Sequence, residues 1–210
     1  MVQFNEGALG SGGFRRRVYD LRASRLLEAA KGLIHEGGCQ QVRVEDVASA
    51  CGVAKGTYYR HFRTREELLS TAVSALDGEL ATHIIAVADG APGCDGLESA
   101  VSAALLAVIQ NLRRRVHAGD GLSARSWPCC LQFSCCPFGG APKSQAAISA
   151  VAERATGREE GSLRLAIELV MSVPVVMCAR GHVDSGDRPS PEFVVGAGLE
   201  MMRSLIQCRG

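Results

Sequence analysis

Apolar residues recur at helical spacing along most of the chain, in segments separated by glycine, proline and polar turns. The first segment begins at Leu21 and ends at Gly37-Gly38, as expected for a glycine stop. Its apolar face is formed by Leu26, Leu27, Ala30, Leu33 and Ile34. Two short helices are predicted next, over Val44–Cys51 and Ala54–Phe62. Gly52 lies between them, where a tight turn favours a positive φ.

Longer helices are predicted in the rest of the chain. Thr64 precedes Glu67 by three positions, which is typical of a capping box, so a helix is expected to begin there and to end near Asp89-Gly90. Further helical patterns cover about 97–115, 144–156, 162–180 and 193–207, whereas 118–142 is less regular. Runs of alternating β-branched residues and internal repeats are absent from the sequence. The pattern therefore predicts an all-α fold.

Composition and charge agree with a folded protein that contacts a polyanion at its N-terminal end. The 210 residues are 47% hydrophobic and 21% charged, with a net charge of +1. Residues 1–70 hold 11 Lys and Arg against 8 Asp and Glu, and the remainder holds 12 against 14. We find neither the ~20 apolar residues of a membrane span nor a secretory signal. A cytoplasmic protein with reduced cysteines and no membrane contact is expected.

The two short helices and their turn, with a helix on either side, are typical of a helix-turn-helix, whose second helix enters the major groove of DNA. Charge for phosphates or base edges is supplied by Lys55, Arg60 and Arg65. Donors for phosphate oxygens are supplied by Thr57, Tyr59 and His61. Gly56 lets the backbone approach DNA closely.

The run VEDVASACGVAKGTYYRHFRTREELL, Val44–Leu69, closely resembles the DNA-binding segment of the TetR family of repressors, and LLEAAKGLIHEGG, Leu26–Gly38, resembles the family's first helix. Beyond residue 90 the resemblance is only to a helical effector domain. The resemblance of the N-terminal segment implies that DNA contacts fall at Lys55, Thr57, Tyr59, Arg60 and His61, and that Arg65 contacts phosphate. It also implies a repressor that is a homodimer, binds an inverted-repeat operator in double-stranded DNA and releases it when an unknown small effector binds.

The sequence departs from the family's pattern in one core residue and in two helix caps. Tyr58 stands where the family has a buried leucine, so its hydroxyl needs a partner or a water molecule. The usual N-cap Ser or Thr is missing before both short helices, where Val42-Arg43 and Ala54 stand instead. Loss of a cap typically costs about 0.5–2 kcal/mol. Arg43 can offset part of this loss by binding phosphate itself.

The predicted domains are a flexible basic tail over 1–17, the helix-turn-helix domain over 18–66 and an effector-binding and dimerisation domain over 67–210. The cluster Arg15–Arg17 fits a mobile arm that reaches the minor groove, and it fits a solvated tail equally well. The sequence leaves both interpretations open.

Large apolar residues of the C-terminal part fit either its core or an effector pocket: Trp127, Phe133, Phe138, Met171 and Met177. Four cysteines are paired as Cys129-Cys130 and Cys135-Cys136, and a thiol- or metal-responsive regulator is the alternative function. Adjacent side chains point apart, so we expect packing or pocket lining and neither a metal nor a cofactor. Cys135 with His117 or His182 has no catalytic spacing, and no enzyme is expected.

Overall fold

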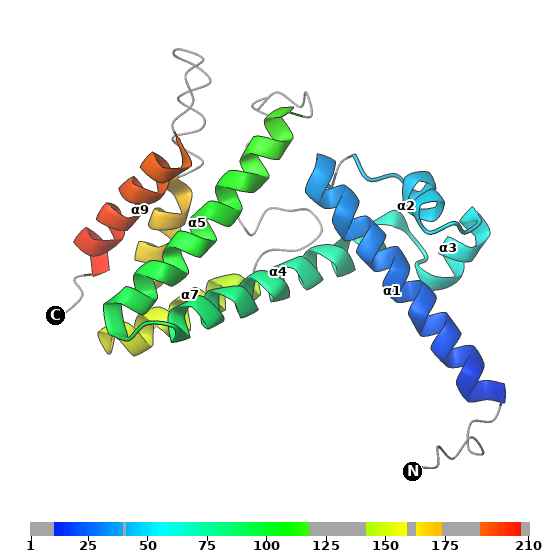
Figure 1. Cartoon of the computed structure of the whole chain (residues 1–210), viewed down its shortest axis with the longest axis horizontal. Helices are drawn as coiled ribbons and strands as arrows, with labels where there is room; N and C mark the ends of the chain where they lie inside the picture. The colour runs from blue at the N-terminus through cyan, green and yellow to red at the C-terminus, as the bar shows by residue number, and fades with distance from the viewer. Residues whose placement is uncertain (1–10, 40, 118–141, 159–162, 174–189, 207–210) are drawn as a thin grey trace, which may run out of the picture. The chain divides into compact units, whose positions relative to one another are not determined.

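The computed structural model describes residues 11–39, 41–117, 142–158, 163–173 and 190–206. Every regular element in these ranges is a helix, which confirms the predicted all-α class. The helices are α1 (Ser11–Gly37), α2 (Val44–Ala50), α3 (Lys55–His61), α4 (Arg65–Asp89), α5 (Gly93–His117), α7 (Pro142–Thr156) and α9 (Pro191–Ile206) (Figure 1). Residues 163–173 are helical as well. No helix of the described ranges is long and apolar enough to cross a membrane.

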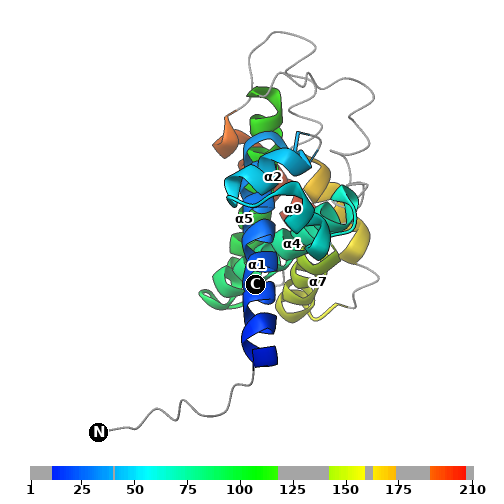
Figure 2. The same cartoon turned by 90° about the vertical axis from the view of Figure 1, so that its right-hand side faces the viewer.

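The chain divides into two compact units, Met1–Ala72 and Val73–Gly210, so the boundary between them falls inside α4. In the first unit α2 and α3 pack against each other and against α1. Figure 2 shows both short helices in front of α1. The apolar side chains buried in this unit include Leu26, Ala30, Ile34, Val44, Val47, Ala48, Tyr58, Phe62, Leu68 and Leu69. The predicted apolar stripe of the first helix therefore forms part of a core.

Helix α1 starts earlier than the sequence pattern predicts. It begins at Ser11, so the part 11–17 of the expected flexible tail is helical, and Arg15–Arg17 lie exposed on this helix. Residues 1–10 lie outside the described ranges. The added turns carry Tyr19 to a contact with α3, and this tertiary support has no counterpart in the local pattern.

The turn between α2 and α3 has the backbone geometry that the sequence predicts. Gly52 has φ +65°, and Gly38, just after α1, has φ +77°. The Gly52 amide donates to the carbonyl oxygen of Ser49, and the Val53 amide donates to that of Ala48, both at 3.0 Å. These bonds close the turn, and only glycine adopts such a φ without strain.

The predicted capping box is present at the start of α4. The Glu67 amide donates to Thr64 Oγ1 at 3.0 Å, as expected. The Glu67 carboxylate reaches back and accepts from the Arg63 amide at 2.6 Å, which is one residue before the cap. The two hydrogen bonds thus fix the backbone between the end of α3 and the start of α4.

The second unit is built around α5, which packs against α7 and α9. Its buried core draws on α4, α5, α7, residues 163–173 and α9, and Met171 packs partly buried against it. The Asp77 carboxylate of α4 is buried and accepts hydrogen bonds from the Lys143 amide at 2.9 Å and the Ser144 amide at 3.0 Å. It therefore caps the start of α7, where Pro142 occupies the first position.

Replacing Gly52 by alanine is expected to lower the free energy of unfolding of the first unit by about 1–2 kcal/mol, because an L-residue is strained at positive φ. Crowding plays no part, since nothing lies within 4 Å of the position its Cβ would take. Gly32 is the matched control. It is equally unobstructed but lies in the interior of α1, so Gly32→Ala should raise stability by up to ~1 kcal/mol. Urea unfolding measures both, and a shift of the same sign in the two variants would contradict the assignment.

Candidate nucleic-acid interface

Helix α3 carries most of the candidate DNA-binding residues, and it contains only seven residues. Its N-cap, Ala54, has extended backbone and no side-chain cap, as the sequence predicts. The carbonyl oxygen of Ala54 accepts from the Thr57 amide at 2.8 Å. At the other end the Phe62 amide donates to the carbonyl oxygen of Tyr58 at 3.0 Å. Isolated helices of this length are unstable in water, so tertiary contacts must hold α3 in shape.

Tyr58 anchors α3 in the core of the first unit. Its side chain is 0% exposed, and its hydroxyl donates to the carbonyl oxygen of Thr64 at 3.2 Å. This bond confirms the expectation that the buried hydroxyl finds a partner. Burial raises the pKa of Tyr58 to about 12, so the phenol stays neutral. The ring also meets Tyr59 edge to face, with centroids 5.2 Å apart.

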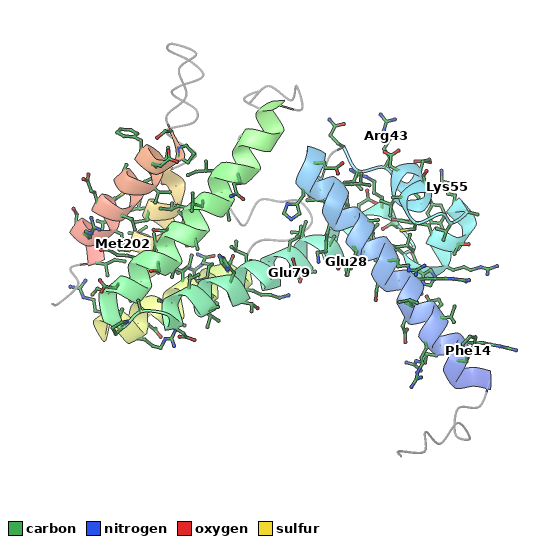
Figure 3. All side chains as sticks on the ribbon, viewed as in Figure 1. Phe14, Glu28, Arg43, Lys55, Glu79 and Met202 are labelled. Atoms are coloured by element: carbon green, nitrogen blue, oxygen red, sulfur yellow. The ribbon has the colours of Figure 1, made fainter. Side chains whose placement is uncertain are left out.

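The outward side of α3 presents its polar and charged residues. Tyr59 is 46% exposed although its neighbour Tyr58 is fully buried. Lys55, Gly56 and Arg60 are exposed as well, and Thr57 is partly buried. We call the surface formed by Lys55, Gly56, Tyr59 and Arg60 the recognition face. Arg43, the exposed N-cap of α2, also lacks a side-chain cap, as predicted. Figure 3 labels Arg43 and Lys55.

Lys55 forms an ion pair with Glu45 in the first turn of α2. Hydrogen bonding between the two side chains lowers the pKa of Glu45 and raises that of Lys55, so both stay charged at neutral pH. Both side chains are more than half exposed, and exposed ion pairs are weak and sensitive to salt. The ammonium group can therefore exchange the carboxylate for a phosphate. Sequence analysis missed Glu45, because no local pattern links it to a lysine in the next helix.

Arg65 makes contacts that its expected role in phosphate binding did not anticipate. Its Nε donates to the carbonyl oxygen of Val42 at 2.7 Å, and its Nη2 donates to that of Cys39 at 2.6 Å. The side chain is partly buried. The guanidinium group thus ties the segment that leads into α2 to the start of α4. A fork of donors suits two neighbouring carbonyl oxygens better than a point charge would.

His61 lies between α3 and α1 rather than on the recognition face. Its ring stacks on Tyr19 with centroids 4.1 Å apart. Its Nδ1 is buried and has no hydrogen-bond partner among the described residues. Burial lowers the pKa of His61, and the positive charges of Arg22 and Arg60 lower it further. The imidazole is therefore neutral at pH 7.

Most residues expected at an effector pocket or a cysteine site lie outside the described residues: Trp127, Phe133, Phe138, Met177, Cys129, Cys130, Cys135, Cys136 and His182. Met171 is described and packs against the core of the second unit. Within the described residues no group of three or more His, Cys, Asp or Glu side chains is placed to hold a metal ion. The pocket and the cysteine alternative stay predictions.

Comparison with known proteins identifies relatives of the N-terminal unit and of the whole fold. Residues 26–72 match the family of bacterial regulatory proteins, tetR family. The HTH-type transcriptional regulator TcmR of Streptomyces glaucescens is 26% identical over 184 residues, which are 87% of this chain and 70% of TcmR.

Solved structures share the fold at low sequence identity. A TetR-family transcriptional regulator from Mesorhizobium loti has a TM-score of 0.58 at 16% identity, covering 90% of this chain and 96% of its own. A transcriptional regulator from Pseudomonas aeruginosa PAO1 has a TM-score of 0.57 at 16% identity, with 90% and 91% covered. RolR in complex with resorcinol has a TM-score of 0.52 at 17% identity, with 91% and 96% covered.

Replacing Arg65 by methionine should destabilise the first unit by on the order of 2 kcal/mol, because two carbonyl oxygens lose a charged donor. Arg63→Met is the matched control, since this nearby side chain is exposed, and it should change stability by less than about 0.5 kcal/mol. Arg65→Lys keeps the charge without the fork and should restore little of the loss. Thermal unfolding compares the variants, and equal stability of Arg65→Met and Arg63→Met would rule out the structural role.

Proposed function

This chain is a member of the TetR family of transcriptional regulators, and we propose that it binds double-stranded DNA through α3 and releases it when a small effector binds. The main support for DNA binding is the exposure of the recognition face. A short helix held by a fully buried tyrosine turns two cations and an exposed tyrosine outward. This is the arrangement that major-groove reading by a second helix requires.

Each residue of the interface receives a role that its chemistry supports. Lys55 and Arg60 contact base edges and phosphates, and Thr57 and Tyr59 donate to phosphate oxygens. Gly56 allows the backbone of α3 to come close to DNA, and Arg43 binds phosphate at the start of α2. To contact DNA, Lys55 must leave Glu45, because its ammonium group cannot bind the Glu45 carboxylate and a group of the DNA at full strength at the same time.

Arg65 and His61 support the interface indirectly in this proposal. The support for Arg65 is that its guanidinium group donates to two backbone carbonyl oxygens. The support for His61 is its stacking on Tyr19 and its buried Nδ1. Both residues would then fix the shape of the unit that presents α3.

A homodimer and effector-controlled release complete the proposal. Large apolar side chains stay exposed on residues 163–173 and α9: Leu165 at 65%, Phe193 at 62%, and Leu169 and Leu205 at 39% each. Exposed apolar side chains on these two helical segments favour association with a second copy. RolR, which has the same fold, is known in complex with resorcinol. A small effector that prefers the conformation unable to bind DNA would release the operator, which makes the protein a repressor.

DNA binding is tested by fluorescence anisotropy on labelled DNA from upstream of the protein's own gene, across a salt series. Lys55→Ala or Arg60→Ala should weaken binding and lower the preference over unrelated DNA, because both residues read base edges. Tyr59→Phe should weaken binding to all sequences about equally, because its hydroxyl meets only phosphate. Wild-type affinity in a Tyr59→Ala/Arg60→Ala double variant would refute the recognition face.

Dimer formation is tested by light scattering at micromolar concentration, where the 22.2 kDa chain should have about twice its own mass. Leu165→Glu should shift the protein toward the monomer, because it places a charge in the proposed contact. Leu21→Glu, at an exposed leucine of α1, should leave the dimer intact. A wild-type monomer that still binds operator DNA would contradict the proposal.

A further inference from the structure

Tyr19 of α1 holds the C-terminal end of α3 by two contacts. Its hydroxyl donates to the backbone carbonyl oxygen of Arg60 at 2.7 Å, across 41 positions of sequence. Its ring stacks on His61 with centroids 4.1 Å apart and planes tilted by 37°. One side chain thus engages the last two residues of α3.

The hydrogen bond from Tyr19 satisfies a backbone carbonyl oxygen in the last turn of α3. The last carbonyl oxygens of a helix lack partners inside the helix. Here the Phe62 amide donates a hydrogen bond to the carbonyl oxygen of Tyr58, and the Tyr19 hydroxyl donates one to the carbonyl oxygen of Arg60. The other end of α3 has no side-chain cap at Ala54. The C-terminal contact therefore has a large share in fixing a helix of seven residues.

The stacking contact explains the unusual state of His61. Its buried Nδ1 finds no hydrogen-bond partner among the described residues, so the ring is held by packing. Burial lowers the pKa of His61, and the positive charges of Arg22 on α1 and Arg60 on α3 lower it further. A neutral ring can pack against the Tyr19 phenol without carrying a buried charge.

We propose that Tyr19 is a positioning residue that sets the sequence specificity of DNA binding by fixing the backbone of Arg60 on the recognition face. Base edges are read through hydrogen bonds that need accurate placement, whereas phosphate contacts tolerate displacement. Loss of the Tyr19 hydroxyl therefore weakens binding to the operator more than binding to unrelated DNA. The inference rests on the proposed function, since it assumes that α3 reads DNA.

The test compares wild type with Tyr19→Phe, which removes the hydroxyl and keeps the ring. Operator DNA is taken from random fragments selected by the wild-type protein, and unrelated DNA of equal length is the reference. Tyr19→Phe should lose roughly three- to tenfold in affinity for the operator, the range of one hydrogen bond, and keep its affinity for unrelated DNA. Leu21→Ala, at an exposed position on the same helix, should change neither affinity.

An NMR titration of the His61 ring protons tests the contact without DNA. In Tyr19→Ala the ring is uncovered, so the pKa of His61 should rise toward its ordinary value of 6.5, and in Tyr19→Phe it should stay near that of wild type. An unchanged pKa in Tyr19→Ala would overturn the contact. A wild-type ratio of operator to unrelated affinity in Tyr19→Phe would overturn the positioning role alone. Failure of the wild-type protein to select any DNA would remove the proposed function and this inference together.

Discussion

A helix of seven residues does not persist in water by itself, and the organisation of the first unit follows from that constraint. Helix α3 exists because other parts of the chain hold it. Tyr58 fixes its inner side in the core, and the Tyr19 hydroxyl binds its last turn. The Gly52 turn sets its direction relative to α2. With Tyr58 turned into the core, α3 leaves the recognition face exposed to solvent.

The positive charges of this unit are divided between structure and surface. Arg65 serves backbone carbonyl oxygens, and Lys55 is paired with Glu45, whereas Arg43 is exposed at the start of α2. The formal excess of positive charge in the N-terminal residues therefore overstates the number of cationic side chains that can bind a polyanion without first breaking a contact inside the unit. In the proposed function, an exchange of Glu45 for phosphate would make DNA binding depend on salt and on close approach of α3, which would favour DNA that fits the groove geometry.

Local patterns predicted most of this fold, and tertiary contacts account for what they missed. Periodicity and glycine placement indicated α2, α3 and the Gly52 turn, because these depend on neighbouring residues. The start of α1 at Ser11 was missed, since the first turns of α1 carry Tyr19, whose hydrogen-bond partner Arg60 lies 41 positions away on α3. Likewise the charge of Arg65 is visible in the sequence, whereas its two carbonyl partners, more than 20 positions away, are not. Its contact with phosphate stays a prediction.

The most direct test of sequence reading by α3 is selection of DNA fragments from a random pool by the purified protein, followed by sequencing. Reading of DNA by the two α3 helices of a homodimer predicts an inverted repeat with half-sites about 34 Å apart or a multiple of that. It also predicts that the Arg60→Ala protein loses base preference at the same position of both half-sites. Enrichment of no sequence by wild type, or an unchanged repeat selected by Arg60→Ala, would contradict it.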